Sequence, residues 1–144
     1  MNVSFQNGRY MREDGTVVQG FNPDGSINVR VLEGSGGGGA LNVTLQEAAT
    51  AAGNGTSFDV GFYKTLTIEV WGTSTSRTVV YEVQSISGAW YPIQGLRIQD
   101  YAMATQTTGT GEVWQFDVTG LAAFRARISA IAGGNVSVRG KAVI

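Results

Sequence analysis

The sequence contains no cysteine and no histidine. Without cysteine, disulfides, thiol nucleophiles and zinc–thiolate sites are excluded. Without histidine, the protein lacks the usual general base and the commonest metal ligand. We therefore expect a protein that is not an enzyme and that binds no cofactor and no metal.

Charge is scarce as well. Only 15% of the residues are charged and the net charge is -1, against about 25% charged residues in ordinary globular proteins. No basic run is present, so neither a nucleic acid nor an anionic membrane is an expected partner. No apolar run approaches the ~18 residues of a membrane span. The opening stretch "NVSFQNGRYMRED" has no apolar core, so we expect no signal peptide.

Residues 1–33 are rich in turn signals. Asn7-Gly8 and Asp14-Gly15 supply the positive φ angles that tight hairpins need. Short alternating segments lie between these turns, which predicts a small β-meander. So small a sheet rarely stands alone, and we expect it to anchor the chain on a partner. Its candidate contacts with a capsid or with sister subunits are Phe5, Tyr10, Met11, Phe21, Val29 and Val31.

A run of glycine and serine follows at residues 34–39. Segments rich in glycine behave as flexible linkers, so we expect this run to join the meander to a second domain at 40–144. A phosphate-binding loop would end in Gly-Lys-Ser/Thr and lead into a helix. Here Ala40 and a strand-like segment follow, which favours a linker over such a loop.

Residues 40–144 contain short alternating segments separated by Gly/Ser/Thr turns. This pattern predicts an all-β domain, an antiparallel β-sandwich of jelly-roll-like type. Pro92 indicates an edge or kinked strand, and the alanine-rich residues 46–52 predict a helical turn or a loop. The predicted core residues are Leu66, Ile68, Val70, Val79, Tyr81, Val83, Phe124, Ala126, Ile128, Val136 and Val138. The predicted outward residues are Arg125, Arg127, Arg139 and Lys141.

The polar residues raise two possible kinds of site, the carboxylate pair of a glycosidase and a calcium-binding loop. A glycosidase needs two carboxylates, but no spacing singles out a pair among Asp59, Glu69, Glu82, Asp100, Glu112 and Asp117. Oxygen-bearing residues alternate at Asn22, Asp24, Ser26 and Asn28, as in a calcium loop. Calcium sites recruit several carboxylates, however, and Pro followed by Asp-Gly is typical of a plain β-turn.

Aromatic residues raise a binding alternative. Trp71, Trp90 and Tyr91 are candidates for stacking on a sugar ring. Trp71 is out of phase with the apolar positions before it, so we expect it on the opposite face of its strand. The other interpretation is that these rings fill the core or a subunit interface, where aromatic residues are enriched.

The second half of the chain resembles a known family. "WYPIQG" at residues 90–95 precedes "DVTG" at 117–120, a strand with alternating Arg125 and Arg127, and a closing strand "VSVRGKAV" at 136–143. This order is similar to the C-terminal β-sandwich of tailed-bacteriophage virion proteins of the head-decoration (cement) and head-fibre type. The resemblance covers about residues 56–144.

The resemblance implies a non-enzymatic virion structural protein that decorates or stabilises the capsid surface. Its expected partner is the major capsid protein or another virion protein, its expected assembly a homotrimer, and its expected location the virion, assembled in the host cytoplasm. The alternative is a tail-fibre, receptor-binding or carbohydrate-binding β-sandwich module.

Overall fold

The computed structural model describes residues 3–6, 9–12 and 39–144, and the chain divides into two compact units, Met1–Gly38 and Gly39–Ile144. In the first unit, β1 (Val3–Gln6) and β2 (Arg9–Arg12) form an antiparallel pair. This pair agrees with the hairpin expected around Asn7-Gly8. The remaining strands of the expected meander and the calcium-like stretch at 22–28 lie outside the described residues, and the domain boundaries at 33 and 39 stay predictions.

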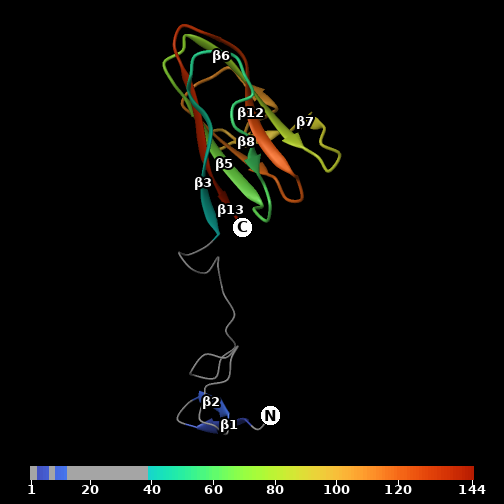
Figure 1. Ribbon diagram of the computed structural model, residues 1–144. Coiled ribbons are helices and arrows are strands. Elements are labelled where there is room, and N and C mark those ends of the chain that lie inside the picture. Colours follow the sequence, from blue (N-terminus) through green and yellow to red (C-terminus); the bar gives the residue numbers. More distant parts are fainter. Residues whose placement is uncertain (1–2, 7–8, 13–38) are drawn as a thin grey trace. The chain divides into compact units, whose positions relative to one another are not determined.

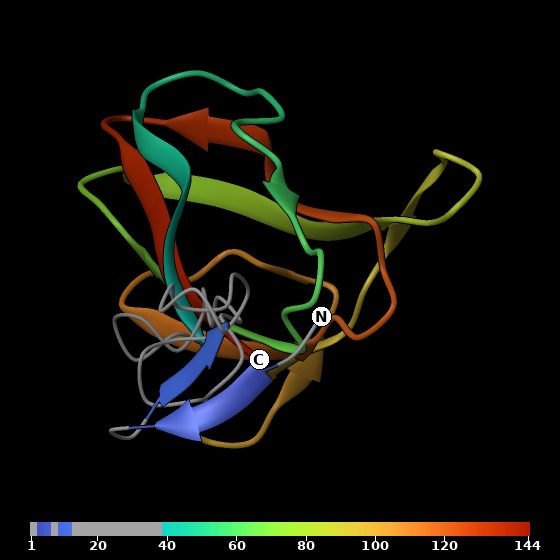
Figure 2. The ribbon, with the colours of Figure 1, turned by 60° about the horizontal axis from the view of Figure 1, so that its bottom comes forward.

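The second unit is a β-sandwich, as predicted (Figures 1 and 2). One sheet has six strands in the order β3 (Ala40–Ala49), β13 (Val136–Val143), β5 (Thr65–Trp71), β11 (Glu112–Asp117), β8 (Gly95–Arg97) and β9 (Met103–Ala104). The other has five: β10 (Gln106–Thr107), β6 (Ser76–Gln84), β12 (Ala123–Ala132) and β4 (Phe58–Asp59), with β7 (Trp90–Pro92) also on β6. All pairings are antiparallel. In the described part of the chain, no helix is long and apolar enough to cross a membrane.

The core lies between the two sheets. Every predicted core residue is buried, which confirms the alternation read from the sequence. Aromatic rings from both sheets meet at its centre. Tyr81 of β6 packs on Trp114 and Phe116 of β11 at ring distances of 5.3 and 4.9 Å, and Phe116 packs on Phe124 of β12 at 4.8 Å. Such pairs contribute about 0.5–1.5 kcal/mol each beyond the area that they bury.

The four charged residues that were predicted to point outward lie on the outer faces. Arg125 and Arg127 alternate with buried positions of β12, and Arg139 and Lys141 do so on β13. Pro92 lies in β7, which pairs with β6 on one side and with no other strand of the described residues. The edge position predicted from proline is therefore confirmed, and the β6–β7 hairpin projects from the sandwich in both views (Figures 1 and 2).

The alanine-rich segment differs from the prediction of a helical turn. Gln46–Ala49 continues β3, and Ala49 pairs with Val136 of β13. The side-chain amide of Gln46 donates a hydrogen bond to the carbonyl of Ala126, at 2.8 Å across the sandwich. Pairing with a distant strand overrides the helix propensity of alanine, because most of the stability of a short helix must come from tertiary packing.

Candidate functional site

The outer face of the six-stranded sheet carries side chains in register across all its strands. One row runs through Asn42, Lys141, Thr67, Gln115, Leu96 and Met103, each paired with the next across neighbouring strands. A second row contains Thr44, Arg139, Glu69 and Val113. Directly opposite residues of an antiparallel pair have neighbouring side chains, so this face is a continuous surface of mixed polar and apolar groups.

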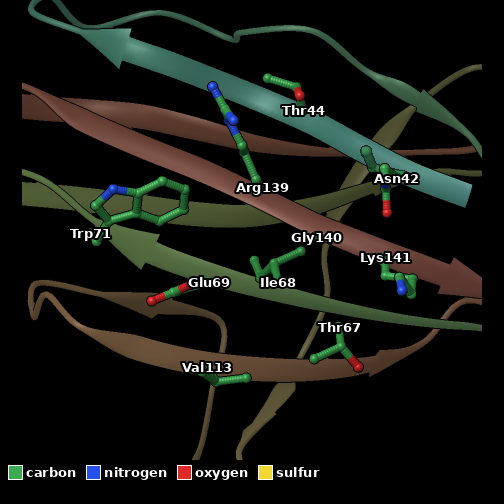
Figure 3. A pocket seen from close by; sticks show the side chains of 11 residues that line it. Asn42, Thr44, Thr67, Ile68, Glu69, Trp71, Val113, Arg139, Gly140 and Lys141 are labelled. Carbon is green, nitrogen blue, oxygen red and sulfur yellow. The ribbon is translucent and has the colours of Figure 1, made fainter.

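A hollow of about 510 Å³ opens on this face, over β3, β13, β5 and β11 (Figure 3). Trp71 lies at one end and Asn42 and Lys141 at the other, with Arg139 and Glu69 between them. The volume falls in the range of about 300–1,000 Å³ that is typical of small-ligand sites. Of the residues predicted to stack on a ligand, Trp71 is the one that lines this hollow.

Beside the part of β3 that lines the hollow (Asn42, Val43 and Thr44), the strand carries β-bulges. Thr44 pairs with Arg139 and Ala49 with Val136, so four residues of β3 face two residues of β13 between these pairs. Bulges bend a strand and redirect its side chains, and they are frequent beside functional sites. Ala48 has the left-handed φ angle of 46°, and its N–H donates to the hydroxyl of Ser137 at 2.9 Å.

The bulges place Glu47 beside Arg139. The Arg139 Nε donates to Glu47 Oε2 at 2.9 Å, and a guanidinium Nη also contacts this carboxylate. Glu69 lies directly opposite Arg139 on β5, yet within residues 39–144 it has no salt bridge or side-chain hydrogen bond. Lys141 likewise has no salt bridge within that range. Within residues 39–144, the hollow therefore holds one hydrogen-bond acceptor, the Glu69 carboxylate, and one donor, the Lys141 ammonium, that form no salt bridge.

Gly140 keeps β13 close to β5 beneath the hollow. A Cβ atom at this position would lie 2.1 Å from the carbonyl oxygen of Thr67 and 3.0 Å from the Cα of Ile68. Distances this short require the backbone to move, so a larger residue would separate the two strands. Glycine is needed here for the close approach of two backbones.

Trp90 and Tyr91 lie on β7, which belongs to the other sheet. The three residues predicted to stack on a ligand therefore do not form one platform. The Trp90 ring is covered by the guanidinium of Arg125, whose central carbon lies 4.0 Å from the ring centre. Tyr91 is 54% exposed and alternates with Trp90 on this short strand.

Arg125 is in turn held by Glu82. Glu82 Oε1 accepts from Arg125 Nε at 2.9 Å and from Arg127 Nε at 3.0 Å. Partial burial would raise the pKa of Glu82, but the hydrogen bonds from Arg127 and Arg125 outweigh it and lower the pKa overall. This carboxylate is therefore held ionised between two cations, which suits a structural ion pair and not a general acid.

A further ion-pair network was missed from the sequence. The guanidinium of Arg97 forms salt bridges with Glu112 and Asp100, each with an N–O distance of 2.7 Å. Its central carbon lies 5.5 Å from the centre of the Trp114 ring. The Trp114 Nε1–H donates to Glu112 at 3.0 Å. The hydrogen bond from Arg97 lowers the pKa of Asp100 to about 2. The Arg-x-x-Asp spacing of Arg97 and Asp100 could have indicated their ion pair from the sequence. The contact of Arg97 with Glu112 could not be predicted in this way, because it depends on the pairing of β8 with β11.

One buried hydroxyl lies near this network. Tyr81 Oη has no hydrogen-bond partner among the described residues, and burial, followed by the charge of Glu112, raises the pKa of this phenol. In the described part of the chain, no group of three or more Asp or Glu residues is placed to hold a metal ion.

The N-terminal candidates for capsid or trimer contact are only partly described. Phe5 and Tyr10 are directly paired across β1 and β2, and Met11 is paired with Ser4. Phe21, Val29 and Val31 lie outside the described residues. Their role as contacts stays a prediction.

Comparison with known proteins gives a family match. The family model described as XepA matches residues 39–142. The chain is 36% identical over 103 residues to the phage-like element PBSX protein XepA and 35% identical over 103 residues to the protein YqxG, both from Bacillus subtilis strain 168. These matches take in 72% of this chain but only 37% of XepA and 35% of YqxG. The chain thus spans little more than a third of these two relatives.

A shorter relative matches over most of its length. The SPbeta prophage-derived protein YomS of the same Bacillus strain is 32% identical over 97 residues, which cover 67% of this chain and 81% of YomS. The crystal structure of YomS superposes with a TM-score of 0.70 at 30% identity, covering 73% of this chain and 93% of YomS. The crystal structure of the PBSX exported protein XepA gives a TM-score of 0.73 at 28% identity, covering 100% of this chain and 49% of XepA.

Proposed function

Because the chain belongs to the XepA family of phage-derived proteins, we propose that it is a non-enzymatic structural protein of a phage particle, which decorates or stabilises the capsid surface. The matched region coincides with the sandwich of residues 39–144. Two of the relatives carry names that assign them to phage elements, PBSX and SPbeta. None of the relatives' names describes an enzymatic activity.

The single observation that carries the non-enzymatic part of the proposal is the pairing of several acidic residues of the sandwich with arginine. Glu82, Glu112 and Glu47 are each bound by arginine, and the pKa values of Glu82 and Asp100 are lowered. A glycosidase needs one carboxyl group whose pKa is raised, so that it can donate a proton. Glu82 and Asp100, whose pKa values are lowered, do not offer such a proton donor, which supports a structural role for these two residues.

Within this proposal, the N-terminal unit attaches the protein to the major capsid protein or to another virion protein. The glycine-rich residues 34–39 then let the sandwich take its own orientation. We also propose that the chain acts as a homo-oligomer, and a trimer is the first expectation. An oligomer makes several weak contacts with the regular lattice of a capsid at once, and the effective concentration of the linked contacts increases the overall affinity.

The test is to purify phage particles from a strain that carries the gene and to quantify the chain in them by mass spectrometry. A decoration protein is expected at a high and constant copy number relative to the major capsid protein. Cryo-electron microscopy of the same particles should then show its density on the capsid. Absence of the chain from the purified particles would refute the proposal.

A second candidate function is favoured by one comparison. The relative XepA, whose crystal structure is known, is called an exported protein. The alternative to a particle component is therefore a phage product that acts free of the particle. The same preparation separates the two functions, because an exported protein would appear in the particle-free supernatant and not in the particle fraction.

A further inference from the structure

We propose that the hollow over β3, β13, β5 and β11 binds a neutral saccharide. The inference concerns the sandwich alone and holds whether the protein is carried on a particle or released. It rests on four features: an open tryptophan ring, hydrogen-bonding groups without partners within residues 39–144, a balanced charge and a lining arginine that is held in place.

The open ring is that of Trp71. The structure places an arginine over each of the other two tryptophans, Arg125 over Trp90 and Arg97 over Trp114. Within residues 39–144, no arginine or lysine is placed over Trp71 in this way. Its half-buried side chain lines the hollow at the end of β5 (Figure 3). A tryptophan face of this kind packs well against the apolar face of a sugar ring, which carries C–H groups.

The polar groups needed for hydroxyls surround this ring. Glu69 offers a carboxylate acceptor, Lys141 an ammonium donor, and Asn42 both a donor and an acceptor. In the part of the sandwich that the structure describes, the side chains of these three residues make no hydrogen bonds of their own. A saccharide, which presents several hydroxyl groups that both donate and accept, is the ligand class that such a mixed set satisfies.

The charges of the hollow argue for a neutral ligand. The lining residues Arg139 and Lys141 contribute two positive charges, and the lining residue Glu69 contributes one negative charge. Glu47, which does not line the hollow, neutralises Arg139, so the sum with Glu47 included is zero. The arginine, which is the better anion ligand, is already bound in a bidentate manner by Glu47. The carboxylate of Glu69 would repel a phosphate or an acidic polymer. The arginine of the hollow is bound by Glu47 and is not free to offset this repulsion.

One lining residue of the hollow, Arg139, is held in place before a ligand arrives. The β3 bulges, next to the residues of β3 that line the hollow, place Glu47 on Arg139, and the bond from Ala48 N–H to Ser137 holds the bulge. A lining side chain that is already held in place loses less entropy on binding.

The test uses the full chain and a panel of neutral oligosaccharides made of glucan, mannan, galactan and chitin oligomers, with polygalacturonate as the acidic comparison. Binding is followed by isothermal titration calorimetry and by intrinsic tryptophan fluorescence. We expect saturable binding of at least one neutral oligomer. The Trp71→Ala variant should lower that affinity about ten-fold or more, which corresponds to ~1.4 kcal/mol.

The matched control is Trp90→Ala, which removes a tryptophan from the other sheet and should leave the affinity unchanged. Should Trp71→Ala fail to fold, Glu69→Gln takes its place, because it alters an exposed side chain without a described partner and should lower affinity while leaving the unfolding midpoint unchanged. The proposal is overturned if no neutral oligomer binds, if only polygalacturonate binds, or if the folded Trp71→Ala or Glu69→Gln variant binds as tightly as the natural chain.

Discussion

The guanidinium carbon of Arg125 lies 4.0 Å from the centre of the Trp90 ring. A cation at this distance over a tryptophan face is attracted by the electron density of the ring. Glu82 Oε1 accepts a hydrogen bond from the Nε of the same guanidinium, so Glu82 of β6, Trp90 of β7 and Arg125 of β12 form one connected cluster. Trp90 therefore acts in the stability of the projecting β6–β7 hairpin, and one face of its ring is already occupied.

The Trp90→Ala variant is expected to lower the free energy of unfolding by about 1–2 kcal/mol, because both the contact with Arg125 and the packing of the ring are lost. Urea unfolding followed by circular dichroism measures this change. The control is Tyr91→Ala, whose exposed side chain should contribute within about 0.5 kcal/mol. If Trp90→Ala and Tyr91→Ala lost the same free energy of unfolding, the contact between Trp90 and Arg125 would not stabilise the protein.

The Glu82→Gln variant is expected to lower the free energy of unfolding at neutral pH by roughly 2 kcal/mol, because the charge-assisted hydrogen bonds to Arg125 and Arg127 are lost. Glu69→Gln is the matched control on the opposite sheet. It should have almost no effect on stability, since Glu69 is exposed and has no described partner. A similar loss for both variants would contradict the role given to the Glu82 pair.

Stability should fall in acid over a defined range. The pKa of Glu82 lies below its ordinary value of 4.5, and that of Asp100 is lowered from 3.8 to about 2. A lowered pKa means that the folded state favours the ionised form, so the stabilisation is complete above the ordinary pKa and is lost as the pH falls through the folded value. Thermal midpoints should therefore drop from about pH 4.5 towards pH 2, and less so in Glu82→Gln. A flat profile over this range would refute the expectation.

The Gly140→Ala variant is expected to lose about 1–3 kcal/mol, the usual cost of forcing an extra group into a packed site. The new Cβ atom would meet the Thr67 carbonyl at 2.1 Å. Gly53→Ala is the control, because nothing lies within 4 Å of a Cβ atom at that position. Chemical denaturation of both variants compares them, and a Gly140→Ala variant as stable as Gly53→Ala would show that β13 and β5 can separate without cost.

A truncated chain that begins at Gly39 is expected to fold on its own, because the sandwich holds the whole described core. Circular dichroism should show a β spectrum with cooperative unfolding. If residues 1–33 are the anchor, the truncated chain should be more monomeric in light scattering and should not be retained by undecorated capsids that retain the full chain. Retention equal to that of the full chain would place the attachment site in the sandwich.

Much of the sandwich followed from alternation in the sequence. Leu66, Ile68 and Val70 were assigned to the core, and Trp71 to the other face, because successive side chains of a strand point to opposite sides. The edge position of β7 followed from Pro92, whose missing N–H cannot serve a central strand. These inferences need only local geometry, and the structure confirms each of them.

The candidate site did not follow from such patterns. Glu47 and Arg139 are separated by 92 positions in the chain, and they meet because β3 carries extra residues opposite β13. No local pattern encodes that register, and the alanines around the bulge even favoured a helical turn. The arginine over Trp90 was equally hidden, since it depends on β7 and β12 lying on either side of β6.

Composition and two-residue periodicity are local properties of the chain, so the class of fold and the inward and outward faces of the strands can be predicted from the sequence. The absence of histidine and cysteine chemistry follows directly from the composition. Only the packing of distant strands leaves the Trp71 ring open, leaves Glu69 without a salt bridge within residues 39–144 and hollows the sheet. Those properties arise from strand order, register and bulges, which are set by the summed free energy of contacts between residues far apart in the chain.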